Sequence, residues 1–170
     1  MFPRSRAGKQ TIGGLALALA LALAGCGGTA PSKTVAVRGP GFVFTAPAGW
    51  TVTRGGRTVG AASGEELVSV TTFRLARAFE PALWPKAVPE LDRVAAELAA
   101  QLGAPAPEGE TVQVAGADAR RYEIAFRRGQ RRLTERIAFV LRGRREYQLL
   151  CRIEHDAAPC ERLLTTFRLE

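Results

Sequence analysis

The chain has 170 residues and a formal net charge of +8, with 46% hydrophobic and 24% charged residues. This composition is ordinary for a globular protein, so it argues against disorder of the whole chain, and the length suits one domain with or without a tail. The sequence pI of about 10.4 favours an anionic partner, such as an acidic protein, anionic lipid, an acidic polymer or nucleic acid. The alternative is a surface on which arginine simply replaces lysine as the solubilising residue.

The first 25 residues have the pattern of a secretion signal. Arg4, Arg6 and Lys9 precede an uncharged run at 12–24 that is rich in leucine and alanine. This run is shorter than the roughly 20 apolar residues that a membrane span requires, and it fits the hydrophobic region of about 7–15 residues in a signal peptide. We therefore expect a signal peptide at residues 1–25.

The signal ends in Leu23-Ala24-Gly25-Cys26, which resembles the lipobox of bacterial lipoproteins at every position. The resemblance implies that the Cys26 sulfur receives a diacylglyceryl group, that cleavage occurs just before Cys26, and that acyl chains such as palmitate anchor the protein. The implied location is exported and lipid-anchored, on the outer face of the cell membrane or the periplasmic face of an envelope membrane, where nucleic acid is a poor partner. An uncleaved anchor, or an ordinary signal peptide with an unmodified Cys26, is the alternative.

After this signal we expect a lipid-anchored flexible linker at 26–40 and a single domain at 41–170. The linker contains glycine, proline and threonine, and its 34–37 segment could add a short strand. Alternating patterns in the domain predict strands at 42–45, 51–54, 58–62 and 66–75. The loop that we expect next, at 76–87, holds Trp84, which either anchors the edge of the core or is an exposed contact.

The clearest helix of the sequence begins near Pro89, a residue that suits a first helical turn because it lacks an N–H. Its apolar residues form one stripe at helical spacing, and Gly103 ends it. The members of the stripe are Leu91, Val94, Ala95, Leu98 and Leu102.

The second half of the chain predicts a strand at 111–114 and then an antiparallel meander. Its strands, at 121–127, 132–142 and 146–153, are joined by short turns at Gly129 and Gly143, and a helix at 158–165 follows. Strands, a long helix, a meander and a terminal helix together predict an α+β fold, an antiparallel sheet packed with helices.

Several segments resemble small exported proteins of the PsbP-like class, which are sandwiches of helices around an antiparallel sheet. The likeness covers residues 42 to 168, and its clearest elements are Phe44-Thr45-Ala46-Pro47-Ala48-Gly49-Trp50, the helix after a Trp-containing loop, Val114-Ala115-Gly116, Arg121-Tyr122-Glu123 and a final strand ending near Cys151. The resemblance implies a PsbP-like sandwich and a role in assembly or partner binding; it implies a fold more than an activity.

The cysteines agree with an exported chain. If Cys26 is lipidated, Cys151 and Cys160 remain as an even pair. Cys151 lies on the last strand and Cys160 on the terminal helix, which must fold back over that strand, so we predict a disulfide; two buried thiols are the alternative. We expect no metal and no cofactor, because two cysteines and the single His155 make a poor ligand set.

No catalytic constellation is evident in the sequence. His155 is the only histidine, and none of the serines after the signal, Ser32, Ser63 and Ser69, lies in a Gly-x-Ser-x-Gly elbow. The glycines at 39–41 and 55–56 lack the flanking pattern of a phosphate-binding loop. We therefore expect that the protein is not an enzyme.

The face of the meander opposite its apolar positions is the candidate binding surface. It carries six arginines against two glutamates, and the planar guanidinium suits carboxylate and phosphate. These arginines are Arg121, Arg127, Arg132, Arg136, Arg142 and Arg152. The leading hypothesis is a non-catalytic binding or assembly module that docks an anionic protein, lipid or wall polymer on this face. The alternatives are a solvated face without a partner, a carrier of a small apolar ligand between sheet and helix, and a hydrolase.

Overall fold

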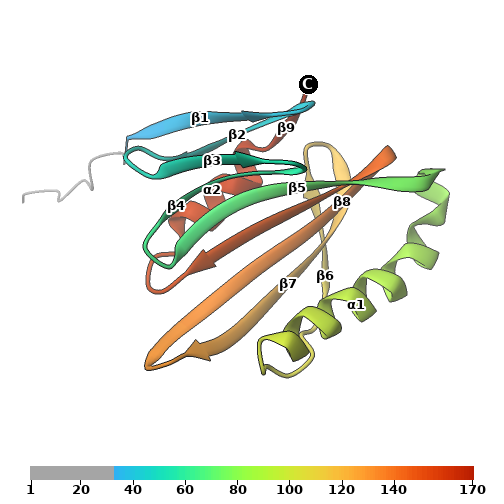
Figure 1. The fold of residues 1–170 in the computed structure, drawn as a ribbon. Helices are drawn as coiled ribbons and strands as arrows, with labels where there is room; N and C mark the ends of the chain where they lie inside the picture. The colour runs from blue at the N-terminus through green and yellow to red at the C-terminus, as the bar shows by residue number, and fades with distance from the viewer. Residues whose placement is uncertain (1–32) are drawn as a thin grey trace, which may run out of the picture. The chain divides into compact units, whose positions relative to one another are not determined.

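The computed structural model describes residues 33–170 (Figure 1). The expected signal peptide, the lipidation residue Cys26 and most of the expected linker lie outside the described residues. The elements of the described part are β1 (Thr34–Gly39), β2 (Phe42–Pro47), β3 (Thr51–Gly55), β4 (Thr58–Ser63), β5 (Glu66–Phe79), the short 3₁₀ helix η1 (Pro81–Leu83), α1 (Trp84–Gln101), β6 (Glu110–Val114), β7 (Ala117–Arg128), β8 (Arg131–Ile153), α2 (Ala158–Thr166) and β9 (Arg168–Leu169).

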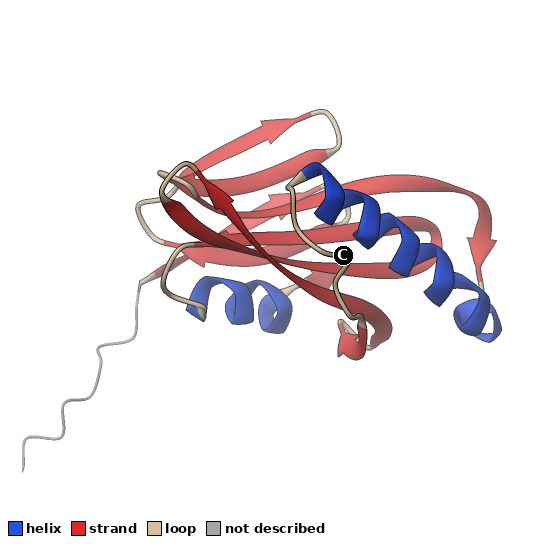
Figure 2. Ribbon diagram, turned by 90° about the horizontal axis from the view of Figure 1, so that it is seen from below, coloured by secondary structure: helices blue, strands red, loops and turns tan. Residues whose placement is uncertain are grey.

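The strands form two antiparallel sheets. The larger sheet has the order β3-β4-β5-β8-β7-β6, and the smaller one has the order β1-β2-β9. Figure 2 shows α1 lying along one face of the larger sheet. The small sheet and α2 cover the other face, where they share one apolar cluster with it. The predicted α+β class, an antiparallel sheet packed with helices, is confirmed.

The predicted meander is present in β7 and β8. Gly129, at a φ of 63°, turns the chain between these two strands, and Gly143, at a φ of 54°, reverses it within β8. The first run of β8 pairs with β7, from Arg128↔Arg131 to Ala119↔Val140. The second run pairs with β5, so Figure 1 shows β8 as an orange and a red-orange run.

The two runs of β8 direct their apolar residues to opposite faces of the sheet. Ile137 and Phe139 of the first run pack with Tyr122 and α1. Leu149 and Cys151 of the second run pack instead with α2 and the small sheet. We expected the apolar residues of all three meander strands on one face, and this prediction is wrong for the last strand. Each run alternates as its sequence indicates, but the turn at Gly143 decides which face the next run presents.

Helix α1 begins five residues earlier than the sequence indicated. Trp84 and Pro85 occupy its first turn, and Pro89 lies inside it. Pro85, rather than Pro89, is the proline of the first turn. A proline is favourable there because its missing N–H would make no intrahelical hydrogen bond. Trp84 packs edge-on against Phe79 at a centroid distance of 6.3 Å, which anchors the start of the helix to the end of β5.

The ordered domain starts before residue 41. Residues 34 to 39 form β1, which pairs with β2 along its whole length, from Thr34↔Pro47 to Gly39↔Phe42. Val37 is completely buried in the core beneath the small sheet. The flexible linker that we expected at 26–40 is therefore wrong from residue 34 onward, because burial of Val37 and a full ladder of backbone hydrogen bonds fix this segment.

A polar cluster holds α1 to β7. Asp92 Oδ1 accepts hydrogen bonds from Tyr122 Oη at 2.7 Å and from Arg120 Nε at 2.9 Å. The Arg120 guanidinium lowers the pKa of Asp92, while burial raises the pKa of Tyr122. Gly109 covers the cluster so closely that a Cβ there would lie 2.6 Å from Arg120 Nε.

The lowered pKa of Asp92 makes the α1–β7 contact pH-dependent. The ionised carboxylate stabilises the fold above its ordinary pKa of 3.8, and this stabilisation is lost as the pH falls through the lower folded value. Asp92→Asn should therefore lower the urea midpoint at pH 7, and this loss should shrink progressively as the pH falls below 3.8. A loss that does not change with pH would contradict a role for the charge.

Candidate functional site

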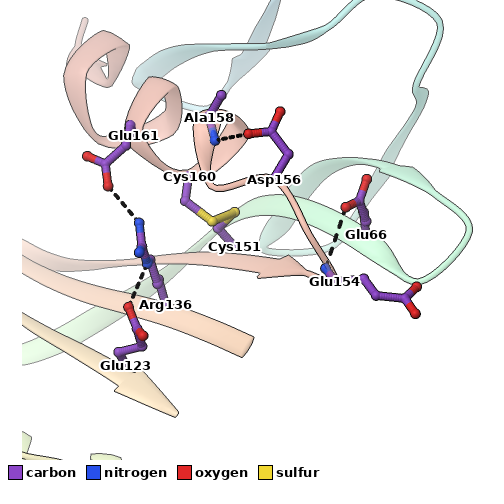
Figure 3. Close-up of a disulfide and its surroundings, with 9 residues drawn as sticks. All are labelled: Glu66, Glu123, Arg136, Cys151, Glu154, Asp156, Ala158, Cys160 and Glu161. Carbon is purple, nitrogen blue, oxygen red and sulfur yellow. Dashed lines mark hydrogen bonds and ion pairs between the residues drawn. A yellow bond between two sulfur atoms is a disulfide. The ribbon is translucent and has the colours of Figure 1, made fainter. Parts of the chain in front are cut away.

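The predicted disulfide is confirmed, and it holds α2 to the larger sheet. Cys151 on β8 and Cys160 on α2 are bonded across nine positions of sequence. Beside the disulfide, Arg136 donates to Glu123 Oε2 at 2.8 Å and to Glu161 Oε1 at 2.6 Å (Figure 3). Arg136 therefore joins β7 to α2 and is occupied as a structural residue.

Two further arginines of the predicted face are also held by carboxylates. Arg121 Nη2 lies 2.9 Å from both carboxylate oxygens of Glu110 on β6. Arg152 donates to Glu135 Oε1 through Nε and Nη2, at 2.8 and 2.6 Å. Glu135 is only 4% exposed, so the carboxylate of this pair is buried.

Arg152 does not share a face with the other candidates. It alternates with Cys151 and therefore points to the α1 side of the sheet. Arg136 alternates with Ile137 on the first run of β8, and so points to the α2 side. The prediction of six arginines on one face is wrong for Arg152, for the same reason that the apolar faces differ: the turn at Gly143 changes the face.

The remaining three candidates have no ion-pair partner among residues 33–170. Arg142 lies beside Gly143, at one end of the first run of β8. Arg127 and Arg132 lie at its other end, where they are cross-strand partners next to the Arg128↔Arg131 pair that closes the hairpin. We call residues 127–132, Arg-Arg-Gly-Gln-Arg-Arg, the hairpin tip; all six are exposed.

The hairpin tip is only partly neutralised. Arg128 pairs with Glu65 at 2.7 Å, and Arg131 lies 3.6 Å from Glu154. Arg127 and Arg132 face each other across the strands, an arrangement of like charges that lowers stability. Two uncompensated positive charges therefore stay at the end of an exposed hairpin, which makes the tip the candidate functional site.

The hairpin tip lies at the end of the strands where the described chain begins. The Lys33 carbonyl accepts a hydrogen bond from the Ala48 N–H at 2.8 Å, in the turn between β2 and β3. The next turn at this end, between β4 and β5, holds Glu65, the partner of Arg128. Figure 1 shows the start of β1 and the β7–β8 hairpin at the same end of the strands.

The described part of the chain shows neither a metal-binding cluster nor a membrane-spanning helix. His155 is exposed in the loop before α2. Residues 33–170 contain no group of three or more histidine, cysteine, aspartate or glutamate side chains placed to hold a metal ion. Within the same residues, no helix is both long and apolar enough to cross a membrane.

The sequence places Arg127 and Arg132 on the predicted arginine face, but the hairpin tip is not evident from it as a unit. Four arginines surround Gly129 in the sequence. A glycine between two pairs of like charges, at the centre of a predicted hairpin, is the signal that could have singled out the tip.

Comparisons with known proteins identify the fold and no family. No family model and no curated protein matches the chain. A solved structure from Bacteroides thetaiotaomicron VPI-5482 is similar at 12% identity and a TM-score of 0.52, over 82% of this chain and 48% of that one. LpqN, described as involved in cell envelope biogenesis of Mycobacterium tuberculosis, is similar at 11% identity and a TM-score of 0.46, over 81% of this chain and 90% of its own. The chain thus spans about half the length of the Bacteroides protein, and at 12% identity the likeness to that protein shows a shared fold alone.

Proposed function

We propose that this protein is an exported, lipid-tethered, non-catalytic binding module that holds an anionic membrane surface with its hairpin tip. The observation that carries the proposal is the position of Arg127 and Arg132, without carboxylate partners in the described chain, at the end where Lys33 enters the domain. Arg121, Arg136 and Arg152, which have carboxylate partners, are assigned structural roles instead.

A lipid anchor on Cys26 would hold the hairpin tip close to the membrane. Cys26 precedes Lys33 by seven residues, which span at most about 25 Å when fully extended. Acyl chains on Cys26 would keep the Lys33 end of the domain, and with it the hairpin tip, near the lipid headgroups. A basic residue at an anionic surface contributes about 1 kcal/mol, and this attraction decays within a Debye length of about 8 Å at physiological salt.

Co-flotation of residues 27–170 with vesicles tests the hairpin tip. This chain has no acyl groups, so any membrane binding that it shows is independent of the lipid anchor. Wild-type protein should bind vesicles of phosphatidylcholine with a third of phosphatidylglycerol, and should not bind phosphatidylcholine alone. Arg127→Glu with Arg132→Glu should weaken binding by at least about 30-fold, the equivalent of about 2 kcal/mol for two lost contacts. High salt should release the wild-type protein.

The matched control is Arg54→Glu with Arg77→Glu, which changes the net charge equally at two exposed positions away from the tip. This variant should keep most of the vesicle binding. Equal loss in both variants would mean that net charge alone causes adsorption, and it would overturn the assignment to the tip.

Carriage of a small apolar ligand between sheet and helix stays the alternative function. The cavity beneath α2, lined in part by Ile137, Leu149 and the disulfide, holds about 10 Å³, so it has room for a single water at most. This size argues against carriage on the α2 side. A lipid or metabolite in the organic extract of purified protein would instead favour the carrier.

A further inference from the structure

A second group of arginines lines a cleft at the end of the strands remote from Lys33. The cleft has a volume of about 430 Å³, and its walls come from the β1–β2 turn, the β3–β4 turn, β5 and the second run of β8. Its lining residues include Arg57, Arg74, Arg144 and Arg145, which we call the cleft arginines. β1 separates this cleft from Lys33, since the strand starts at Thr34 and ends next to Pro40, another lining residue.

Neutral groups, rather than carboxylates, hold three of these four guanidinium groups in place. Arg145 donates to the Pro40 carbonyl and Arg144 to the Ala76 carbonyl, each at 3.0 Å. The Arg57 guanidinium lies over the Phe73 ring, 5.0 Å from its centroid. None of the cleft arginines forms an ion pair within residues 33–170, so their positive charges stay uncompensated, while neutral contacts hold Arg57, Arg144 and Arg145.

The nearby acids do not neutralise the cleft. Glu170 pairs with Arg38. Glu146, the cross-strand partner of Phe73, is not among the residues that line the cleft. The cleft is therefore a concentration of positive charge within the described structure.

This arrangement costs stability, since Arg74 and Arg145 are direct cross-strand partners. Like charges at such positions repel each other across about 5 Å. A cost of this kind with no local compensation is typical of a functional site.

A polar group without a partner also lies in the cleft wall. The Thr72 hydroxyl oxygen is buried and has no hydrogen-bond partner among the described residues. Thr72 lines the cleft between Arg57 and Arg74. Buried polar groups in folded proteins nearly always have a hydrogen-bond partner. A ligand atom that bonds the Thr72 hydroxyl would supply the missing partner.

From the charge, the unpaired hydroxyl and the size of the cleft, we infer that it binds a small, soluble phosphate ester. Guanidinium groups match phosphate oxygens with paired N–H donors, and four of them suit a ligand with at least two negative charges. The volume is that of a small-molecule site and exceeds what a phosphate group alone fills. Phe73 adds an apolar wall for the organic part of the ligand. The position remote from Lys33 favours a soluble ester over a lipid headgroup.

The test is calorimetric titration of the full-length chain in neutral detergent micelles. Glucose 6-phosphate and pyrophosphate are the probes, and glucose is the uncharged blank. We expect saturable binding of both phosphate probes and none of glucose. Arg74→Glu should weaken binding by at least about tenfold, and Thr72→Val by about tenfold. Mixed micelles that contain phosphatidic acid should not compete with glucose 6-phosphate; full competition would overturn the choice of a soluble ligand.

Two readouts separate a ligand site from a structural cluster. Arg74→Glu creates an opposite-charge pair with Arg145, so its melting temperature should rise while its phosphate binding falls. Arg127→Glu makes the same change in the equivalent Arg127↔Arg132 pair, and it should keep phosphate binding intact. No binding by the wild-type chain at millimolar probe, or equal weakening by both variants, would overturn the inference. The vesicle assay of the hairpin tip does not depend on this result.

Discussion

Cys26→Ser is expected to abolish lipid attachment completely. The wild-type chain should incorporate an alkyne analogue of palmitate and end up with residue 26 as its new N-terminus, whereas the variant should do neither. The physical effect is large, because each buried methylene contributes about 0.8 kcal/mol and two acyl chains suffice for stable anchoring. Labelling in cells, followed by mass spectrometry of the intact protein, measures both outcomes at once.

The control for this experiment is the double variant Cys151→Ser with Cys160→Ser, which removes the disulfide but keeps Cys26. It should still incorporate the label. Undiminished label in Cys26→Ser would place the lipid elsewhere. An unlabelled wild-type chain that is cleaved at another position would favour an ordinary signal peptide, and the membrane attachment of the hairpin tip would then rest on charge alone.

Arg152→Met is expected to lower the free energy of unfolding by about 3–5 kcal/mol, a large share of the 5–15 kcal/mol typical of a domain. Its cause is the carboxylate of Glu135, which is 4% exposed and would lose the guanidinium that it contacts at 2.6 and 2.8 Å. Urea unfolding at pH 7 measures the change as a lower midpoint. The vesicle binding of the variant, measured below its midpoint, should equal that of the wild type.

A double-mutant cycle distinguishes the value of the pair from the cost of an unpaired charge. Glu135→Leu with Arg152→Met removes both charges and should recover most of the lost stability, since apolar replacements of buried ion pairs are often neutral or stabilising. Glu135→Gln should cost less than Arg152→Met, because the side chain of Arg152 is 19% exposed and can reach water. A double variant as unstable as Arg152→Met alone would show that Glu135 is not the source of the loss.

The proposed hairpin tip and the proposed cleft use the same chemistry for different purposes. Each contains a cross-strand pair of arginines, Arg127↔Arg132 in one and Arg74↔Arg145 in the other. The pairs lie at opposite ends of the strands. In the tip the charges are on an exposed hairpin, which suits an extended surface such as a membrane. In the cleft the walls enclose about 430 Å³, which suits a small ligand.

Local sequence patterns predicted the parts of this protein that depend on neighbouring residues. Alternation located β2, β4 and β7, and helical spacing located α1 although not its first turn. The even pair of cysteines predicted the disulfide, because the terminal helix had to return over the last strand. These features follow from periodicity, turn residues and short loops, which act over a few positions of the chain.

The tertiary structure alone decided which residues meet across long separations. The sequence by itself determined the α+β class, the arginine-rich meander and the Cys151–Cys160 bridge. It did not show that β1 is part of the domain, that Arg152 lies on the other face with Glu135, or that Arg57, Arg74 and Arg145 gather in one cleft. The physical reason is that alternation fixes which side chains share a face within one strand, whereas turn geometry and sheet order fix which faces come together.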